Sequence, residues 1–376
     1  MNNPLKSIQP FGQSIWLDYI RRSFTANGGL KKMIDEDGLR GVTSNPAIFE
    51  EAIARSDDYW ETIRPLAQSG QSSEEIFLAL AVEDVQQAAD LFKGVYESTN
   101  ALDGYVSLEV SPSLALDTEG TLTEARSSWK LLNRPNAMIK VPGTVEGLPA
   151  IEGLISDGIN VNVTLLFGLE RYRQVALAYI AGLEKRAQRG EPLDRVASVA
   201  SFFLSRIDSL VDPMLEKVMA AGGPKADLAK TLRGQVAVDS AKKAYQIYQE
   251  VFGTDRFKAL AAKGAKPQRL LWASTSTKNK DYSDVKYVEA LIGPDTVNTV
   301  PMETLDAYRD HGQPANRLQD DMAGAVSRLG QLQEVGISLD AVTKQLEEEG
   351  IQKFIKPFNS LMAVLEEKRK EGAVAV

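Results

Sequence analysis

Eight short apolar segments, separated by segments with helical periodicity, constrain the fold of this chain more than any other feature. Buried parallel strands are short and rich in aliphatic residues, and the chain between two such strands usually forms a helix. The alternation therefore predicts a parallel α/β sheet. The count of eight predicts a closed (β/α)8 TIM barrel, with a doubly wound open sheet as the alternative. The expected strands are residues 14–18, 41–44, 105–110, 137–141, 160–166, 195–201, 269–274 and 296–300.

The domain organisation follows from the length and from the absence of a linker. No Ser/Gly/Pro-rich stretch divides the 376 residues, and α/β barrels often use this much chain as one domain. We therefore expect a single domain over 1–376, with helical insertions at 57–101 and 207–262 and C-terminal helices at 318–371. Within this scheme, Thr121 followed by Glu124 forms a capping-box pattern, which predicts a helix that begins there and runs to about Leu132.

Composition excludes several classes of function. The chain has no cysteine and one histidine, so this count excludes disulfides, thiol nucleophiles and multi-histidine metal sites. The net charge of −8 argues against nucleic-acid binding. No apolar run reaches the length of about 20 residues that a membrane helix needs, and residues 1–10 lack the core of a signal peptide. We expect a cytoplasmic protein that needs no metal or organic cofactor.

Lys140 lies among the apolar residues of the fourth expected strand, which ends at Val141 and is followed by Pro142, Gly143 and Thr144. A charged lysine is costly to bury, and that cost is relieved when the amine is held neutral. A neutral amine can attack a carbonyl group and form a Schiff base. The alternative is a lysine at a strand end whose ammonium group reaches into water.

Further polar residues fall at the carboxyl ends of the expected strands, which meet at one rim of a barrel. A Schiff-base enzyme needs a carboxylate to move protons and amides to hold sugar hydroxyls, and this rim would supply both. Taken singly, the carboxylates could be paired strand-end charges, the first asparagine a helix cap and the threonine an ordinary strand residue. Besides Lys140, the rim residues are Asp18, Asn45, Glu109, Asn162 and Thr164.

A second group of hydroxyls and cations follows the sixth and seventh strands. Ser201 and Arg206 are expected at the start of one helix, and Ser276 and Lys278 lie in a loop rich in serine and threonine. Such groups near helix N-termini suit a phosphate, whereas the alternative is a solvated polar loop with a surface arginine. The chain has neither a GxxxxGK[S/T] loop nor a GxGxxG loop after a strand, so nucleotide binding loses its usual support.

Five stretches of the chain, in the same order, resemble the transaldolase family. They cover most of the chain, and the last two are specific for the family. The stretches are Asp18 after its apolar strand, Gly-Val-Thr-Ser-Asn-Pro at 41–46, Val-Ser-Leu-Glu-Val at 106–110, Met-Ile-Lys-Val-Pro-Gly-Thr at 138–144 and Gly-Ile-Asn-Val-Asn-Val-Thr-Leu-Leu-Phe at 158–167. The length and the insertions resemble the longer bacterial branch of that family.

The resemblance implies a class I aldolase barrel and a transferase of the non-oxidative pentose phosphate pathway. The reaction would move a dihydroxyacetone unit from sedoheptulose 7-phosphate to glyceraldehyde 3-phosphate, giving erythrose 4-phosphate and fructose 6-phosphate. The implied roles are Schiff-base lysine for Lys140, acid/base for Asp18, handling of a catalytic water for Glu109 and Thr164, hydroxyl binding for Asn45 and Asn162, and phosphate binding for Ser201 and Arg206.

The loop after the seventh strand departs from the family pattern. Where the family commonly has Ser-x-Arg, this chain has Ser276-Thr277-Lys278, and lysine lacks the bidentate fork of arginine. Two alternative functions stay open at this point. A fructose 6-phosphate aldolase would release the three-carbon unit to water, and a catalytically inactive protein would only bind sugar phosphates. The chain is expected to be a monomer or a homodimer with no nucleic-acid or membrane partner.

Overall fold

The computed structural model describes residues 3–374 and contains a closed barrel of eight parallel strands, paired in the order β1 to β8. The barrel confirms the predicted fold class and excludes the open sheet. Its strands are β1 (Gln13–Asp18), β2 (Gly41–Thr43), β3 (Tyr105–Glu109), β4 (Ala137–Pro142), β5 (Val161–Leu166), β6 (Ser198–Phe203), β7 (Arg269–Ala273) and β8 (Thr296–Val300).

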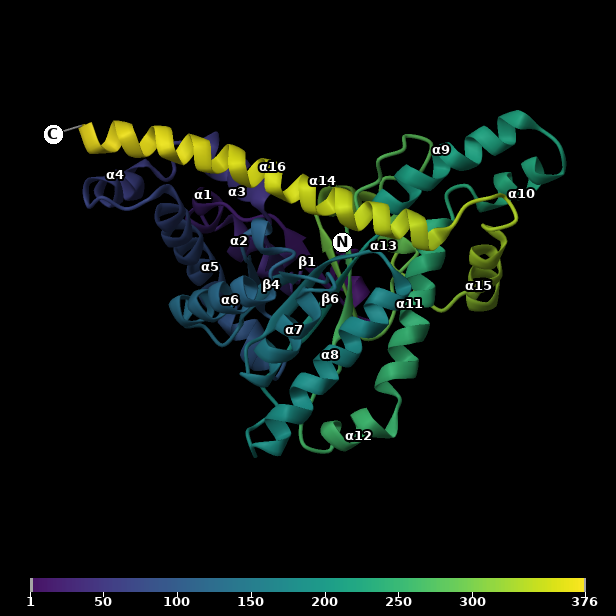
Figure 1. Ribbon diagram of the computed structural model, residues 1–376, viewed down its shortest axis with the longest axis horizontal. Coiled ribbons are helices and arrows are strands. Elements are labelled where there is room, and N and C mark those ends of the chain that lie inside the picture. Colours follow the sequence, from purple (N-terminus) through teal and green to yellow (C-terminus); the bar gives the residue numbers. More distant parts are fainter. Residues whose placement is uncertain (1–2, 375–376) are drawn as a thin grey trace.

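Helices follow the strands and pack around the outside of the barrel (Figure 1). Up to β5 they are η1 (Lys6–Phe11), α1 (Arg22–Ala26), α2 (Gly29–Glu36), α3 (Pro46–Ala54), α4 (Trp60–Gln68), α5 (Ser73–Ser98), η2 (Pro112–Leu114), α6 (Thr118–Leu132) and α7 (Gly147–Ser156). After β5 they are α8 (Leu169–Gln188), α9 (Ser205–Ala221), α10 (Pro224–Leu232), α11 (Val236–Phe252), α12 (Asp255–Ala261), α13 (Lys286–Glu289), α14 (Met302–His311), α15 (Met322–Gln331) and α16 (Leu339–Val374).

Most of the strand bounds agree with the sequence predictions to within one residue, but α6 and β6 differ by more. Helix α6 begins at Thr118 because the carboxylate of Asp117 accepts a hydrogen bond from the backbone N–H of Gly120 at 3.0 Å, so the helix is already capped before Thr121. Strand β6 runs from Ser198 to Phe203 rather than over 195–201. The prediction that Ser201 lies at the start of a helix is therefore wrong, because pairing with β7 extends the strand beyond it.

A buried ion pair closes the amino-terminal end of the barrel, which we call the barrel floor. The Arg269 guanidinium lies 2.8 Å from the Asp103 carboxylate, and both side chains are almost fully buried. Ser14 and Trp16 of β1 each donate a hydrogen bond to Asp103. The guanidinium also donates to the carbonyl of Leu102 and to the Ser14 hydroxyl. The charges at the floor are therefore paired and hydrogen-bonded, as stable burial requires.

Helix α16 is a 36-residue helix that lies across the helices on one side of the molecule (Figure 1). It packs against α3, α4, α5 and α9. No helix in residues 3–374 is long and apolar enough to cross a membrane.

Candidate active site

Lys140 lies inside the carboxyl-terminal end of the barrel, which we call the barrel mouth. Successive side chains of β4 point to opposite faces of the sheet, and that of Lys140 points into the barrel. The residue is 4% exposed. The Nζ atom donates a hydrogen bond to the carbonyl oxygen of Ser44 at 3.1 Å and lies 3.1 Å from Oε2 of Glu109. The register of the sheet explains this contact, because Glu109 is directly opposite Lys140 on β3.

Both carboxylates predicted for the rim lie at the mouth close to Lys140, where the Glu109 side chain is buried and Asp18 is half-buried. Burial raises the pKa of Glu109 to about 7, against the opposing effect of the Lys140 charge. Burial also raises the pKa of Asp18, although the charge of Lys140 and the hydroxyl of Thr43 oppose that change. A carboxyl group with a pKa near neutrality can both give and take a proton at physiological pH, which suits general acid–base chemistry.

Thr43 positions Asp18 from the neighbouring strand. Its hydroxyl lies 2.6 Å from Oδ1 of Asp18 and 2.7 Å from the hydroxyl of Thr299 on β8. The two strands pair with Asp18 opposite Thr43. Asn45 follows β2 and caps α3, where its side chain accepts a hydrogen bond from the backbone N–H of Ile48 at 3.1 Å. Asn45 is thus a helix cap, and it also lines the cavity described below.

The remaining predicted residues of the barrel interior form a buried polar group behind Lys140. Asn162 is opposite Lys140 on β5, and its amide nitrogen donates to the hydroxyl of Ser107 at 3.1 Å. The Ser201 hydroxyl donates to the amide oxygen of Asn162 at 2.7 Å. The hydroxyl of Thr164 is buried and has no hydrogen-bond partner. Ser201 thus contacts Asn162, whereas the resemblance had implied that it binds phosphate with Arg206.

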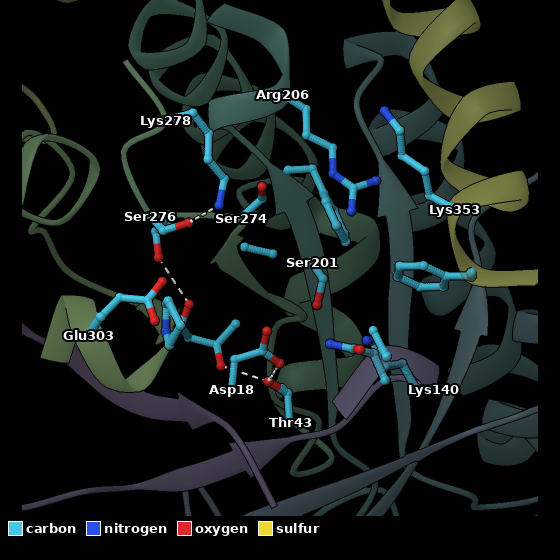
Figure 2. A pocket seen from close by; sticks show the side chains of 18 residues that line it. Asp18, Thr43, Lys140, Ser201, Arg206, Ser274, Ser276, Lys278, Glu303 and Lys353 are labelled. Atoms are coloured by element: carbon cyan, nitrogen blue, oxygen red, sulfur yellow. Dashed lines mark hydrogen bonds between the residues drawn. The ribbon is translucent and has the colours of Figure 1, made fainter. Parts of the chain in front are cut away.

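A cavity of about 270 Å³ opens from Lys140 towards the surface. Seven of the ten predicted site residues line it, and Glu109, Asn162 and Thr164 lie behind its wall. Its lining consists of Asp18, Thr43, Asn45, Ala47, Lys140, Ser201, Phe203, Arg206, Ala273, Ser274, Thr275, Ser276, Lys278, Thr299, Pro301, Glu303, Lys353 and Phe354. Figure 2 shows Asp18, Thr43 and Lys140 on one side of this cavity and three cationic side chains on the opposite side.

The three cations are Arg206, Lys278 and Lys353 (Figure 2). Arg206 belongs to α9, Lys278 to the loop after β7, and Lys353 to α16. Nη1 of Arg206 is buried without a hydrogen-bond partner, and burial lowers the pKa of this guanidinium from its ordinary value. Lys278 donates a hydrogen bond to the hydroxyl of Ser276 at 2.7 Å. This end of the cavity can neutralise an anion several bonds away from a carbonyl group held at Lys140.

Sequence reasoning missed several polar and aromatic residues of the cavity, among them Thr43, Glu303, Lys353 and Phe354. Thr43 could have been found, because it lies near the end of the second expected strand, two residues before Asn45, and therefore belongs to the same rim. Lys353 and Phe354 belong to the C-terminal helix, and no local pattern indicates that this helix reaches the mouth. Among residues 3–374, no group of three or more acidic or histidine side chains could hold a metal ion.

Comparisons with known proteins agree with this geometry. Residues 15–365 match the family model described as Transaldolase/Fructose-6-phosphate aldolase. The chain is 50% identical over 375 residues to a transaldolase of Trichodesmium erythraeum, with 99% of each chain covered. It is 48% identical to transaldolase 2 of a Nostoc species, with 98% of each chain covered. It is 47% identical to a transaldolase of Thiobacillus denitrificans, where 96% of this chain and 99% of the relative are covered.

Proposed function

The chain belongs to the transaldolase family of transferases, and from that premise we propose a reaction that proceeds through a Schiff base on Lys140. The reaction moves a dihydroxyacetone unit from sedoheptulose 7-phosphate to glyceraldehyde 3-phosphate, giving erythrose 4-phosphate and fructose 6-phosphate. The observation that carries the proposal is the position of the Lys140 amine, which lies 3.1 Å from the Glu109 carboxylate and lines the same cavity as Asp18.

Formation of the Schiff base needs one nucleophile and one group that moves protons. The Nζ atom of Lys140 adds to the ketose carbonyl, and the resulting carbinolamine loses its hydroxyl group as water to give an iminium ion. The buried Glu109 carboxyl, whose pKa is raised to about 7, supplies the proton that the departing hydroxyl needs and takes it back in the reverse step. Thr164, whose hydroxyl is unpartnered, holds that water with Glu109.

Cleavage of the carbon–carbon bond follows from the positive charge of the iminium ion. Asp18 removes the proton of the C4 hydroxyl, the C3–C4 bond breaks and its electrons flow to the iminium nitrogen. The three-carbon unit stays on Lys140 as an enamine while the aldose phosphate leaves. Attack of the enamine on the second aldose phosphate, with proton return from Asp18, reverses these steps. Thr43 positions Asp18 for both transfers through its 2.6 Å hydrogen bond.

The polar residues around these groups fit the two ends of a sugar phosphate. Asn45 lines the cavity beside Asp18, and we assign it, together with Asn162, to the dihydroxyacetone hydroxyls. Ser201 orients the Asn162 amide through its 2.7 Å hydrogen bond. At the opposite end of the cavity, the Arg206 guanidinium, whose Nη1 atom has no hydrogen-bond partner, and the Ser276–Lys278 pair suit the phosphate group. Each proton transfer in this scheme has a side chain to perform it, so the scheme requires no cofactor.

An assay with fructose 6-phosphate tests the reaction, with and without erythrose 4-phosphate. We expect continued release of glyceraldehyde 3-phosphate only when the four-carbon acceptor is present. Without the acceptor the three-carbon unit is retained on Lys140, and release stops at about one equivalent per enzyme molecule. Free dihydroxyacetone as the main product would identify a fructose 6-phosphate aldolase instead. Binding of fructose 6-phosphate without turnover in either mixture would identify an inactive sugar-phosphate binding protein.

Three broader predictions accompany this function. The helices within 57–101, 207–262 and 318–371 belong to one domain with the barrel, so a single cooperative unfolding transition is expected. The chain is a monomer or a homodimer, which sedimentation in solution distinguishes. The enzyme works in the cytoplasm, where the pentose phosphate pathway supplies its substrates.

A further inference from the structure

The amino-terminal half of helix α16 is fixed against α8 and the end of β5. Glu347 pairs with Arg171 of α8 at 3.8 Å. Gly350 allows a close approach to the barrel, because a Cβ atom at this position would lie 3.0 Å from the side chain of Leu165 on β5. This half of the helix is therefore positioned directly above the end of the strand that carries Asn162 and Thr164.

The carboxyl-terminal half of α16 is fixed on the opposite side, over α3, α4 and α5. Ser360 donates a hydrogen bond to Glu50 of α3 at 2.8 Å, and Lys368 donates to the carbonyl oxygens of Ile53 and Ser56. The ring of Phe358 packs edge-on against Phe77 of α5. With both halves attached, the middle of the helix is held over the mouth of the barrel.

Two consecutive residues in the middle of α16 line the catalytic cavity. Phe354 is 7% exposed, and the Lys140 Nζ atom lies 5.5 Å from the centre of its ring. Lys353 lies on the side of the cavity that holds Arg206 and Lys278 (Figure 2). The helix thus presents an aromatic face to the reactive amine and a positive charge to the opposite end of the cavity.

The charge of Lys353 is only weakly engaged within the protein. Its Nζ atom lies 3.2 Å from the Glu349 carboxylate on the preceding turn, and its side chain is 53% exposed. An exposed ion pair of this kind on one helix contributes little to stability. Lys353 can therefore leave Glu349 and bind another anion at a small cost in free energy. A phosphate group accepts several charge-assisted hydrogen bonds and can bind Lys353 together with Arg206.

We propose that Lys353 of the C-terminal helix is a phosphate-binding residue that sets the preference of this enzyme for phosphorylated sugars. The inference rests on the proposed function for the identity of the substrate. In the absence of substrate, Glu349 holds the Lys353 side chain. When a sugar phosphate fills the cavity, the ammonium group turns to the phosphate and complements Arg206 and Lys278. Lysine at 278 contributes a single-point charge rather than a bidentate fork, which leaves room for a third cation.

The test compares Lys353→Met with Lys356→Met and Lys353→Arg. Methionine preserves the length and the helix propensity of lysine but removes its charge. Lys356 is the matched control, because it is exposed on the same helix, loses the same charge on substitution and does not line the cavity. Steady-state kinetics are measured with fructose 6-phosphate and with unphosphorylated fructose, each with erythrose 4-phosphate as the acceptor. Binding of inorganic phosphate is measured separately by titration calorimetry.

For Lys353→Met we expect the KM for fructose 6-phosphate and the Kd for inorganic phosphate each to rise about fivefold, with a much smaller change in kcat. The ratio of kcat/KM for fructose 6-phosphate to that for fructose falls by the same factor. Lys353→Arg restores most of the loss, and Lys356→Met matches the wild-type protein. Equal KM and Kd values for Lys353→Met and Lys356→Met would overturn the inference. Absence of turnover in the wild-type protein would instead refute the proposed function, while calorimetry would still decide the role of Lys353.

Discussion

The barrel contains a buried ion pair at each end, and the two pairs are built differently. At the floor, Arg269 and Asp103 are 2.8 Å apart. Asp103 also accepts hydrogen bonds from Ser14 and Trp16, and Arg269 also donates one to the Leu102 carbonyl. At the mouth, Lys140 and Glu109 are 3.1 Å apart, yet Oε2 of Glu109 lacks a partner with hydrogen-bond geometry. Both pairs are shielded from water, so the difference lies in how completely their polar atoms are satisfied.

This difference separates stability from chemistry. A buried pair whose donors and acceptors are satisfied fixes the structure, and its loss is costly. In the incompletely bonded pair, burial raises the pKa of the Glu109 carboxyl group to about 7, which suits the proton transfers that we propose for the mouth. The incompletely bonded ion pair therefore lies at the mouth, where a substrate can supply the missing hydrogen bonds. The fully hydrogen-bonded ion pair lies at the floor.

Substitution of Lys140 by arginine gives the largest expected effect and tests the chemical role of the mouth. Arginine keeps a positive charge beside Glu109 but cannot form an imine, so turnover should fall at least about 10⁴-fold. The variant should still unfold cooperatively, and Lys93→Arg on the exposed face of α5 should retain full activity. Turnover within about tenfold of the wild-type enzyme would contradict the assignment.

Substitution of Arg269 by methionine should affect stability rather than chemistry. It leaves the Asp103 carboxylate buried without its cation, which should lower the free energy of unfolding by about 3–5 kcal/mol. Chemical denaturation provides the measurement, and kcat of the folded fraction should stay within about twofold of the wild-type value. The matched control is Arg55→Met, which breaks the exposed pair with Glu51 and should cost less than about 1 kcal/mol. Loss of activity without loss of stability in Arg269→Met would erase the distinction between floor and mouth.

Substitution of Glu109 by glutamine should change how stability depends on pH. The pKa of Glu109 rises from 4.5 to about 7 on folding, so the native state binds this proton more tightly than the unfolded state does. The contribution of this group to stability is therefore full below about pH 4.5 and declines by about 3 kcal/mol as pH rises to about 7. Denaturation curves across that range should show a decline that is larger in the wild-type protein than in Glu109→Gln by about 3 kcal/mol. Glu119→Gln, at an exposed position of α6, should behave like the wild type, and the same pH dependence in the wild-type protein and Glu109→Gln would refute the interpretation.

Substitution of Thr43 by valine gives the smallest expected effect. The Thr43 hydroxyl donates to the Asp18 carboxylate at 2.6 Å and opposes the rise in the Asp18 pKa that burial causes. Its removal should raise that pKa further, so the acidic limb of the profile of kcat/KM against pH should move upward by about 0.5–1 pH unit. The same exchange at Thr296, near the floor end of β8, should leave the limb in place. A shift to lower pH in Thr43→Val would be inconsistent with this hydrogen bond.

The barrel could be predicted from the sequence because each buried parallel strand is a short apolar run that stands apart from the helices around it. The eighth strand, Thr296–Val300, matches its predicted bounds. Boundaries were less predictable where tertiary contacts decide them. Pairing with β7 carries β6 on to Phe203, and the Asp117 cap starts α6 three residues before the Thr121 pattern. Neither feature is visible in the residues of one segment alone.

The residues of the mouth divide in the same way. Asp18, Glu109 and Lys140 could be predicted, because the carboxyl ends of parallel strands in a barrel share one rim. The sequence could not predict which of the rim residues line the cavity and which are buried behind its wall, because that depends on the direction of each side chain. Lys353 and Phe354 reach the mouth through a helix far along the chain, whose position follows from its attachment at both ends.

Chemical trapping tests the central claim most directly. Borohydride added during incubation with fructose 6-phosphate reduces an iminium ion to a stable secondary amine, and peptide mapping then locates it. The account predicts one three-carbon or sugar adduct, on the peptide that contains Lys140, and no adduct in Lys140→Arg. An adduct on another lysine, or continued turnover without any adduct on Lys140, would contradict it.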